Sequence, residues 1–452
     1  MAKQNKPAIR FKEFTDAWEQ RKLGELLKTI TTGKSVNSDD GAVAVGDIGI
    51  LKTSCVSYDR FNPYESKPVV KDELQSVKCA VEKDSVIVSR MNTPERVGAC
   101  GYVSTDFPNL FLPDRLWKLK FQDNVDAYFV YMMLVSSVYK EKITSMASGT
   151  SGSMYNIPKE TFLNLQLVVP VQTSEQRKIG QVLRQLNDLI TLHQRKYDKL
   201  QVLKKAMLEK MFPKNGSSVP EIRFKGFTDA WEQRKLEDYL TVSTEKNTGN
   251  IYGRSDVLSV SGDYGIVNQI EFQGRSFAGA SVSNYGVVQT GDVVYTKSPL
   301  NSNPYGIIKT NKGKPGIVST LYAVYHPKKN AFSDFIQVYF EQHARMNNYM
   351  HPLVNKGAKN DMKVSAENAL KGPVCFPSRI EQESISAFFS VLDNLITLHQ
   401  RKPYSHIQRR CNMLNEAQST DKFCEYYAKW ITVYKKGAIR QVTMDKYLMT
   451  QK

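Results

Sequence analysis

I-R-F-K-E-F-T-D-A-W-E-Q-R-K-L, residues 9–23, returns at residues 222–236 with a single change. A second repeated segment, L-I-T-L-H-Q-R-K, occupies residues 189–196 and again residues 395–402. The first repeat is termed the box here. The chain is therefore two successive units, each with a box at its start and the second repeat near its end, and such repeats define the architecture before any local pattern does.

The segments between the repeats, about 24–174 and 237–380, show little similarity to each other. Each unit has roughly two hundred residues, which is the size of a domain and not of a solenoid repeat. Constant segments around divergent inserts indicate a protein that holds two different recognition domains in equivalent positions.

The composition favours a polyanionic partner. The 452 residues are long enough for two or three domains with real cores, and 41% hydrophobic with 24% charged residues is ordinary for a globular protein. A net charge of +17 is not ordinary. Such a charge favours nucleic acid or an anionic membrane, although a merely basic soluble protein stays an alternative.

The sequence carries no membrane or secretion signal. It has no run of about 18 apolar residues, so no membrane span is expected. Residues 1–11 contain no apolar core of a signal peptide. The six cysteines lack C-x-x-C spacing, which is typical of reduced thiols and not of a disulfide framework or a zinc site. We therefore expect a cytoplasmic protein, nucleoid-associated when it is on DNA.

A long helix is predicted from residue 175 to about residue 212, where Phe212-Pro213 ends it. Apolar residues step by three and four along it, as they do on a helical seam. The seam residues of this helix are Ile179, Val182, Leu186, Leu189, His193, Leu200 and Leu203. In the second unit they are Ile385, Phe388, Leu392, Leu395 and His399. The two seams are expected to pack on each other, with the histidines as packed residues and not catalytic ones.

The second helix is predicted to be shorter than the first. Pro403 follows its repeat directly, and a proline inside a helix removes a hydrogen bond and clashes with the preceding turn. We therefore expect the helix to cover residues 381–402 and to end or kink near Lys402. Residues 403–452 are then an unrelated basic tail.

No catalytic motif is recognisable in the chain. Asn62-Pro63-Tyr64 and Asn303-Pro304-Tyr305 are each one proline short of an amine-methyltransferase motif and are typical of turns. Gly33-Lys34-Ser35 matches the end of a phosphate-binding loop, but Lys28 stands where its first glycine should be. The histidines are dispersed, and no clustered metal ligands are present. We predict a protein that is not an enzyme and has no catalytic or metal site.

DNA contact is better supported, because each unit pairs a β-like run with basic and amide side chains. Residues 85–89 and their counterpart, residues 292–296, are predicted strands. Arg and Lys suit guanine and Asn suits adenine in the major groove, while glycine and lysine suit a phosphate. Ordinary solvated loops are the alternative. The candidates after the first strand are Arg90, Asn92, Thr93 and Arg96, with Ser148, Thr150 and Ser151 in a later glycine loop. Those of the second unit are Lys297, Ser298, Asn301 and Asn303, with Lys356, Lys359 and Asn360 in the later loop.

The doubled F-T-D-A-W-E-Q-R-K-L box and the doubled L-I-T-L-H-Q-R-K segment resemble those of specificity subunits of type I restriction-modification systems, over about residues 8–402. The resemblance implies a mixed α/β (α+β) fold with an internal pseudo-twofold repeat. Two target-recognition domains would be separated by long helices that form an antiparallel coiled coil. The implied boundaries are 1–174 and 222–380 for these domains, 175–212 and 381–402 for the conserved helices, 213–221 for a linker and 403–452 for the tail.

The resemblance also implies the function and the partners. Each recognition domain would read one half of a split double-stranded DNA target, and the helices would dock two adenine-N6 methyltransferase subunits. Restriction and translocase subunits would join that complex. No cofactor is expected on this chain, because S-adenosylmethionine, ATP and Mg would bind the partner subunits. The alternative is a truncated or fused DNA-binding protein that sequesters the methyltransferase without supporting its activity.

The tail has a second, shorter resemblance. From about Thr420, F-C-E-Y-Y-A-K-W-I-T-V-Y-K-K-G is similar to the start of a phage-type tyrosine recombinase. The regions that carry the catalytic residues of that family are absent from this sequence, so no recombinase activity is expected.

Overall fold

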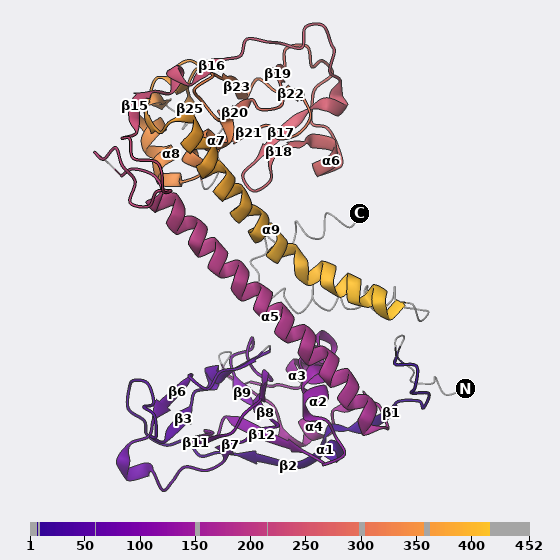
Figure 1. Ribbon diagram of the computed structural model, residues 1–452. Helices are drawn as coiled ribbons and strands as arrows, with labels where there is room; N and C mark the ends of the chain where they lie inside the picture. The colour runs from indigo at the N-terminus through magenta and orange to yellow at the C-terminus, as the bar shows by residue number, and fades with distance from the viewer. Residues whose placement is uncertain are drawn as a thin grey trace. The chain divides into compact units, whose positions relative to one another are not determined.

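The computed structural model describes residues 7, 10–58, 60–149, 154–214, 216–297, 303–356 and 362–415. The chain divides into two compact units, which meet in sequence between Leu192 and His193 (Figure 1). The first unit takes in the chain up to Leu192, and the second runs from His193 to Arg401. Both mix helices and strands, so the predicted mixed α/β class is confirmed.

The first unit contains the elements up to the first part of the long helix α5. Its helices are α1 (Leu23–Leu26), α2 (Ala127–Leu134), α3 (Ser137–Ser145), α4 (Lys159–Leu163) and the start of α5 (Thr173–Lys210). Its strands are β1 (Glu19–Lys22), β2 (Leu27–Thr32), β3 (Gly49–Leu51), β4 (Val56–Ser57), β5 (Arg60–Phe61), β6 (Ser66–Pro68), β7 (Ala80–Val81), β8 (Ser85–Ser89), β9 (Met91–Asn92), β10 (Cys100–Val103), β11 (Phe107–Phe111), β12 (Leu116–Phe121), β13 (Tyr155–Asn156) and β14 (Gln166–Val169).

Strand β8 lies inside a four-stranded antiparallel sheet of order β10-β8-β12-β2. All five of its residues are buried, because both faces of the strand are covered. Val86 and Val88 pack in the cluster that contains Phe129 of α2. Ile87 points to the other face, into the cluster with Leu51 of β3. The alternation of side chains along β8 therefore connects two hydrophobic cores.

The second unit repeats this plan. Its helices are α6 (Gln269–Gln273), α7 (Ser333–Phe340), α8 (His343–Met350) and the first part of α9 (Arg379–Asn415). Its strands are β15 (Glu232–Lys235), β16 (Leu240–Val242), β17 (Leu258–Ser261), β18 (Gly265–Asn268), β19 (Gly286–Val288), β20 (Val293–Thr296), β21 (Ile308–Thr310), β22 (Gly316–Val318), β23 (Tyr322–Pro327), β24 (Asn355–Lys356), β25 (Met362–Lys363) and β26 (Pro373–Phe376).

Strand β20 occupies the place of β8. It lies inside an antiparallel sheet of order β16-β23-β20-β21, and all four of its residues are buried. Val293 and Tyr295 face the main core of the unit, whereas Val294 faces a smaller cluster. The predicted equivalence of residues 85–89 and 292–296 is therefore confirmed.

The box closes each unit on itself. Strand β1, at the end of the first box, pairs antiparallel with β14, the last strand before α5. Strand β15 pairs in the same way with β26, the last strand before α9. The first and the last strand of each unit therefore lie beside each other, although the sequence separates them by a whole domain.

A buried ion pair fixes each box to its helix. Arg10 donates from Nε and Nη2 to the two carboxylate oxygens of Glu175, both at 2.7 Å. Arg223 donates to Glu381 in the same way, at 2.7 and 2.8 Å. Both glutamates are buried in the first turn of their helices, where a negative charge is favourable. Each pair is termed a clamp below, since bidentate Arg–carboxylate contacts fix orientation as well as distance.

The next residue of each helix extends the clamp. The Gln176 side chain accepts from the backbone N of Asp126 at 3.0 Å and donates to the carbonyl of Pro170. Gln382 accepts from the backbone N of Phe332 at 2.9 Å and donates to the carbonyl of Pro377. The repeated E-Q pair therefore holds together the helix start, the residue after the last strand and the residue before α2 or α7.

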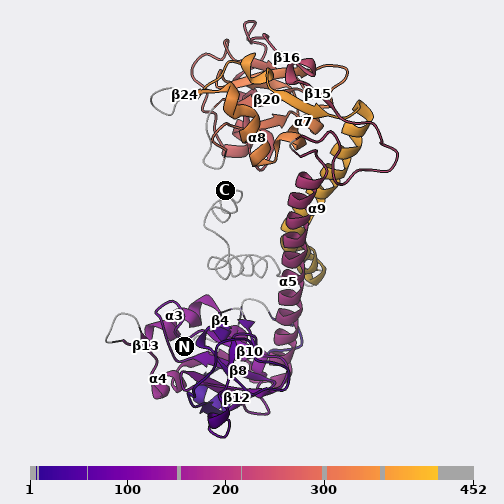
Figure 2. The same ribbon diagram turned by 90° about the vertical axis from the view of Figure 1, so that its left-hand side faces the viewer.

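Within the second unit, α9 runs antiparallel to the second half of α5 (Figures 1 and 2). The buried apolar residues of α9 are Ile385, Phe389, Leu392 and Ile396, and the half-buried His399 follows them on the same face. The predicted positions Phe388 and Leu395 were one residue out of phase, since Leu395 is 40% exposed and Phe388 only half-buried. Steps of three and four residues fit both the predicted set, with Phe388 and Leu395, and the observed set, with Phe389 and Ile396. The two sets share Ile385, Leu392 and His399.

The predicted seam of the first helix, α5, also needs a correction. Leu203 is 41% exposed and does not lie on the seam, whereas Leu200 packs on the core of the second unit. Leu186 is buried as predicted, and Val182 and Leu189 are half-buried. Ile179 packs on the core of the first unit and not on another long helix.

The second helix was predicted to end or kink near Lys402. It does not end there, because helix α9 continues to Asn415 and Pro403 lies inside it. A proline removes one backbone hydrogen bond, and the turns on either side keep theirs, so the helix need not end there. The tail from residue 416 lies outside the described residues. Among the residues that are described, no helix is long and apolar enough to cross a membrane.

Candidate nucleic-acid interface

The first candidate loop leaves β8 at Arg90. The Arg90 side chain is half-buried, and its Nε donates to the carbonyl of Asp114 at 2.8 Å. The carbonyl of Arg90 accepts from the backbone N of Ile157 at 2.9 Å. Farther along the loop, Thr93 and Arg96 are exposed. The start of the loop is therefore held in place, while its middle faces solvent.

The fold joins the glycine loop to this first loop. Strand β13, which follows the glycine loop, pairs antiparallel with β9 of the first loop. Ser148, at the start of the glycine loop, is exposed and exchanges two backbone hydrogen bonds with Asn156, at 3.1 and 2.9 Å. The described ends of the glycine loop thus lie beside the first loop. Thr150 and Ser151 lie outside the described residues.

Asn92 does not fit the predicted base contact. Its side chain is 8% exposed, and its amide donates to Oγ of Ser89 at 3.0 Å. Its side-chain oxygen accepts from the backbone N of Thr93 at 2.9 Å. Both ends of the amide are therefore used to shape the turn that presents Thr93 and Arg96.

In the second unit, Lys297 follows β20 as Arg90 follows β8. Its backbone N donates to the carbonyl of Leu321 at 3.0 Å, and its side chain is half-buried. Burial lowers the pKa of Lys297, the neighbouring charge of Lys246 lowers it further, and Glu367 acts in the opposite direction. Two lysines therefore share this part of the second unit, and the exposed Lys246 was not found by the sequence analysis.

The other candidates of the second unit are only partly visible. Asn303 is half-buried, and its carbonyl accepts from the backbone N of Gly306 at 3.0 Å. Lys356 lies in β24, which pairs with β25 as a hairpin. The side chain of Lys356, and the whole of Ser298, Asn301, Lys359 and Asn360, lie outside the described residues.

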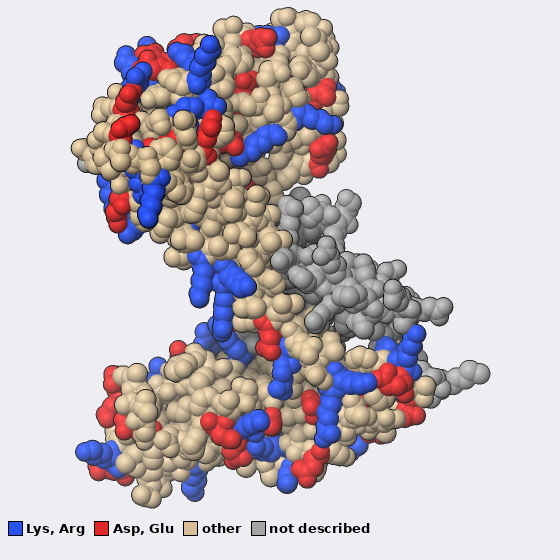
Figure 3. All heavy atoms as spheres, viewed as in Figure 1, with Lys and Arg blue, Asp and Glu red and all other residues tan. Residues whose placement is uncertain are grey.

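The charged side chains of both units are mixed in sign. Figure 3 shows Lys and Arg interspersed with Asp and Glu on each unit, and Lys and Arg gathered along α5. The exposed cations of that stretch of α5 are Arg195, Lys196, Lys199 and Lys205. Since Lys and Arg exceed Asp and Glu by 17 over the whole chain, the surface attracts phosphate in general. Base specificity has to come from the loops.

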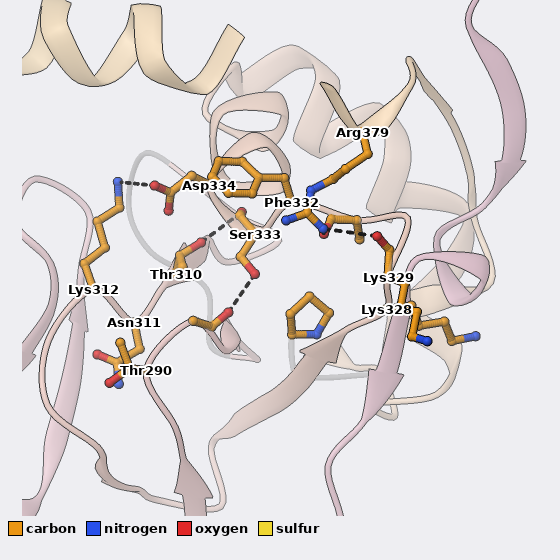
Figure 4. A pocket seen from close by; sticks show the side chains of 13 residues that line it. Thr290, Thr310, Asn311, Lys312, Lys328, Lys329, Phe332, Ser333, Asp334 and Arg379 are labelled. Atoms are coloured by element: carbon orange, nitrogen blue, oxygen red, sulfur yellow. Dashed lines mark hydrogen bonds and ion pairs between the residues drawn. The ribbon is translucent and has the colours of Figure 1, made fainter. Parts of the chain in front are cut away.

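A pocket of about 500 Å³ lies in the second unit, at the start of α7 (Figure 4). Its polar groups bond to one another: Ser333 Oγ donates to the carbonyl of Gly291 at 2.6 Å, and Lys312 pairs with Asp334 at 3.1 Å. Arg379 donates to the carbonyl of Lys329 at 3.2 Å and to Glu383 at 2.8 Å. These contacts explain the pocket as part of the scaffold. No cluster of three possible metal ligands occurs among the residues that the structure describes.

The histidines of the repeated helical segment meet as predicted for packed residues. Within the second unit, Nδ1 of His193 lies 3.0 Å from Nδ1 of His399, and His193 is buried. Nearby, Lys204 joins three elements, with Nζ at 2.8 Å from Glu341 and 2.7 Å from Asp393 of α9. Polar contacts thus accompany the apolar packing of α5 against α9.

Comparisons with known proteins define the class. Residues 15–202 match the family model of the type I restriction modification DNA specificity domain. The described fold is similar to that of a type I restriction-modification S subunit from M. genitalium, with a TM-score of 0.52 at 14% identity, over 90% of this chain and 97% of that one. The first part of the chain thus matches a DNA specificity domain, and the structural similarity shows a shared fold.

Among individual proteins, the chain is similar to the specificity subunit of the type I restriction enzyme EcoEI from Escherichia coli. The two are 23% identical over 160 residues, which is 35% of this chain. The match covers about a quarter, 27%, of the length of that relative. Because the match covers so little of that relative, the target and the partners of this chain are matters for proposal.

Proposed function

We propose that this chain is the DNA specificity subunit of a type I restriction-modification complex and that each unit reads one half of a bipartite double-stranded DNA target. The observation that carries the proposal is the equivalent position of two different loops on one repeated scaffold. Arg90 and Lys297 both leave the central strand of their sheets, and the flanking boxes and helices are nearly the same. One scaffold that carries two different recognition loops suits a DNA target with two different halves.

The helices supply the docking surface for the partners in this proposal. Several apolar side chains of α5 and α9 are exposed although both helices already pack on each other in the second unit. They are Leu192, Val202 and Leu203 of α5 and Val391, Leu395 and Leu398 of α9. Exposed apolar residues at helical spacing suit a further helix. We assign this surface to two adenine-N6 methyltransferase subunits, with restriction and translocase subunits in the full complex.

The chemistry then belongs to the partners. Methyl transfer would use S-adenosylmethionine on the methyltransferase, and translocation with cleavage would use ATP and Mg on the restriction subunit. The contribution of this chain is to choose the DNA and to hold the catalytic subunits on it.

The proposal is tested by long-read mapping of N6-methyladenine in a host that carries the gene with its methyltransferase, against the same host without the gene. A new split motif, with two short specific halves around a fixed gap, is expected. Exchange of residues 24–174 for those of another specificity subunit should change one half only. If both proteins are present and no motif appears, the recognition proposal fails.

A second candidate is a protein that sequesters the methyltransferase. Pro403 and the unrelated residues after it favour this reading, because the second helix departs there from the sequence of the first. Co-purification separates the two: about two methyltransferase subunits per chain with methylation activity support the specificity subunit. A stable complex without methylation supports sequestration.

A further inference from the structure

One tyrosine connects the two candidate loops of the first unit. Tyr58 lies at the turn between β4 and β5, outside both loops. Its hydroxyl donates to the carbonyl of Val97 at 2.7 Å. The same oxygen lies 3.4 Å from Oγ1 of Thr144 on α3. A single hydroxyl group therefore contacts two segments that are far apart in sequence.

Each contacted segment leads to a recognition loop. Val97 follows Arg96 directly and closes the loop that begins at Arg90. Thr144 lies at the end of α3, four residues before Ser148 and the glycine loop. The position of the Tyr58 hydroxyl thus sets the distance between the end of one loop and the start of the other.

Close packing makes that distance rigid. Gly98 has a φ of 79°, and a Cβ at this position would lie 2.5 Å from Cγ2 of Ile143 on α3. Only glycine allows the first loop to approach α3 so closely. The Tyr58 ring is also held from outside, because Nζ of Lys140 on α3 lies 4.0 Å from its centroid. Burial raises the pKa of Tyr58 to about 12, so the hydroxyl stays a donor at neutral pH.

In the second unit, the counterpart hairpin carries a different described contact. There the β17–β18 hairpin lies beside β21, in the place that β4–β5 takes beside β10. The tyrosine at its turn, Tyr264, stacks on Phe272 with ring centroids 5.1 Å apart. A change in the Tyr58 contact should therefore affect one unit only.

The geometry points to Tyr58 as a positioning residue for specificity: it fixes Val97, which closes the Arg90–Arg96 loop, against the end of α3 that leads to Ser148, without touching DNA itself. This inference rests on the proposed DNA recognition. It assigns part of the specificity of the first unit to a residue that belongs to neither loop.

The test compares Tyr58→Phe with Tyr64→Phe in the full chain with its methyltransferase, by genome-wide N6-methyladenine mapping. The first change removes the hydroxyl and keeps the ring. The second is the matched control, because Tyr64 is 90% exposed in the same part of the chain. The readout is the methylation of sites that differ from the motif by one base, scored separately for each half.

Tyr58→Phe should reduce discrimination in one half about two- to tenfold, the range expected for one hydrogen bond, and leave the other half unchanged. Thr144→Val, which removes the longer contact, should act in the same half and less strongly. The unchanged half shows that each variant is folded. Equal loss in both halves, or an unchanged first half, overturns the inference. A wild-type chain without any motif instead refutes the proposed function.

Discussion

The two units share their scaffold and differ in how their loops are supported. Both clamps have the same geometry, Arg10 with Glu175 and Arg223 with Glu381. The described parts of the loops do not: in the first unit β9 of the first loop pairs with β13 after the glycine loop, while in the second unit β24 and β25, on either side of the later loop, pair with each other. The difference teaches that the repeated residues determine where a reader sits, and that the inserts determine how it is built.

The environment of the box tryptophan shows the same contrast on a smaller scale. Trp18 donates from Nε1 to Glu175 at 3.2 Å and so belongs to the first clamp. Trp231 lies in the core of the second unit, 5.9 Å from the ring of Phe212 at the end of α5. Its Nε1 has no hydrogen-bond partner within the described residues. Both tryptophans pack edge-to-face on an aromatic ring, Phe129 of α2 or Phe335 of α7, so the contrast lies in the hydrogen bond of Nε1.

The largest effect is expected from the clamps. Glu175→Ala and Glu381→Ala each leave a largely buried arginine without its carboxylate, which should lower the free energy of unfolding by about 3–5 kcal/mol. Glu175→Ala should cost more, because Trp18 loses its acceptor too and Arg223 keeps the carbonyl of Asp229. Urea unfolding followed by tryptophan fluorescence measures both. Glu25→Ala, in an exposed pair with Arg21, is the control and should change little; equal effects of all three would refute the clamp.

A smaller effect is a pH dependence of stability that is expected in the second unit and not at the corresponding position of the first. Burial acts to raise the pKa of Glu341, but Lys309 and Lys204 outweigh it, so the pKa lies below its usual value. The pairing therefore stabilises the second unit above the unfolded pKa of about 4.3, and this is lost as the pH falls through the folded pKa. Lys204→Met should cost about 1.5–3 kcal/mol at pH 7 and weaken this acid dependence. The first unit has Val135 at the corresponding position.

The clearest check on Lys204→Met is urea unfolding at pH 7 and near pH 4, for the wild-type chain and the variant. The difference in the free energy of unfolding between the two chains should shrink on acidification. A difference that stays constant would show that Lys204 acts through packing of its aliphatic chain alone.

Arg90→Ala and Lys297→Ala should each weaken recognition in a different half of the target. A contact to guanine predicts a loss of about 1–3 kcal/mol in binding and relaxed specificity at one base. A loss of affinity that is equal for all DNA sequences, with a smaller dependence on salt, would instead make the residue a phosphate contact. Binding to duplexes with single base changes in each half, at two salt concentrations, distinguishes these outcomes. Effects of both variants on the same half would break the equivalence of the units.

The smallest effect is expected for Asn92→Ala. The substitution removes the hydrogen bonds to Ser89 and Thr93, which should lower the free energy of unfolding by about 0.5–1.5 kcal/mol. Any change in specificity should be confined to the base that Thr93 or Arg96 reads. Thermal unfolding and the methylation map of the variant give both quantities. A loss of specificity as large as that of Arg90→Ala, at unchanged stability, would restore Asn92 as a base contact.

The scaffold was predictable because repetition marks it. The box, the long helix up to about Met211 and the equivalence of β8 and β20 follow from doubled residues and buried β-branched runs. The sequence did not determine which face of α9 is buried. At two steps of the pattern, Phe388-Phe389 and Leu395-Ile396, it has two adjacent apolar residues, and either could lie on the buried face. The effect of Pro403 on the helix end was overestimated. A proline disfavours helix locally, but the hydrogen bonds of the turns on both sides can outweigh this preference.

The position of a candidate residue was predictable only where it follows a strand. Arg90 and Lys297 follow β8 and β20 as predicted, and their contact with DNA stays a prediction. Tyr58 and Lys246 carry no sequence signal, because they come next to the loops only through folding. Asn92 has the right chemistry for adenine, but its burial is decided by Ser89 and the turn, which a one-dimensional pattern does not contain.

The pairing of β1 with β14 and of β15 with β26 has a practical consequence. The backbone N of Leu23 donates to the carbonyl of Leu165 at 2.8 Å, and that of Leu236 to the carbonyl of Gly372 at 3.0 Å. Entry and exit of each variable segment are therefore one hydrogen bond apart, as in positions that accept whole inserted domains. We therefore expect each segment between the paired strands to be exchangeable. A replacement of different length or topology needs only two adjacent ends that connect to the same pair of strands.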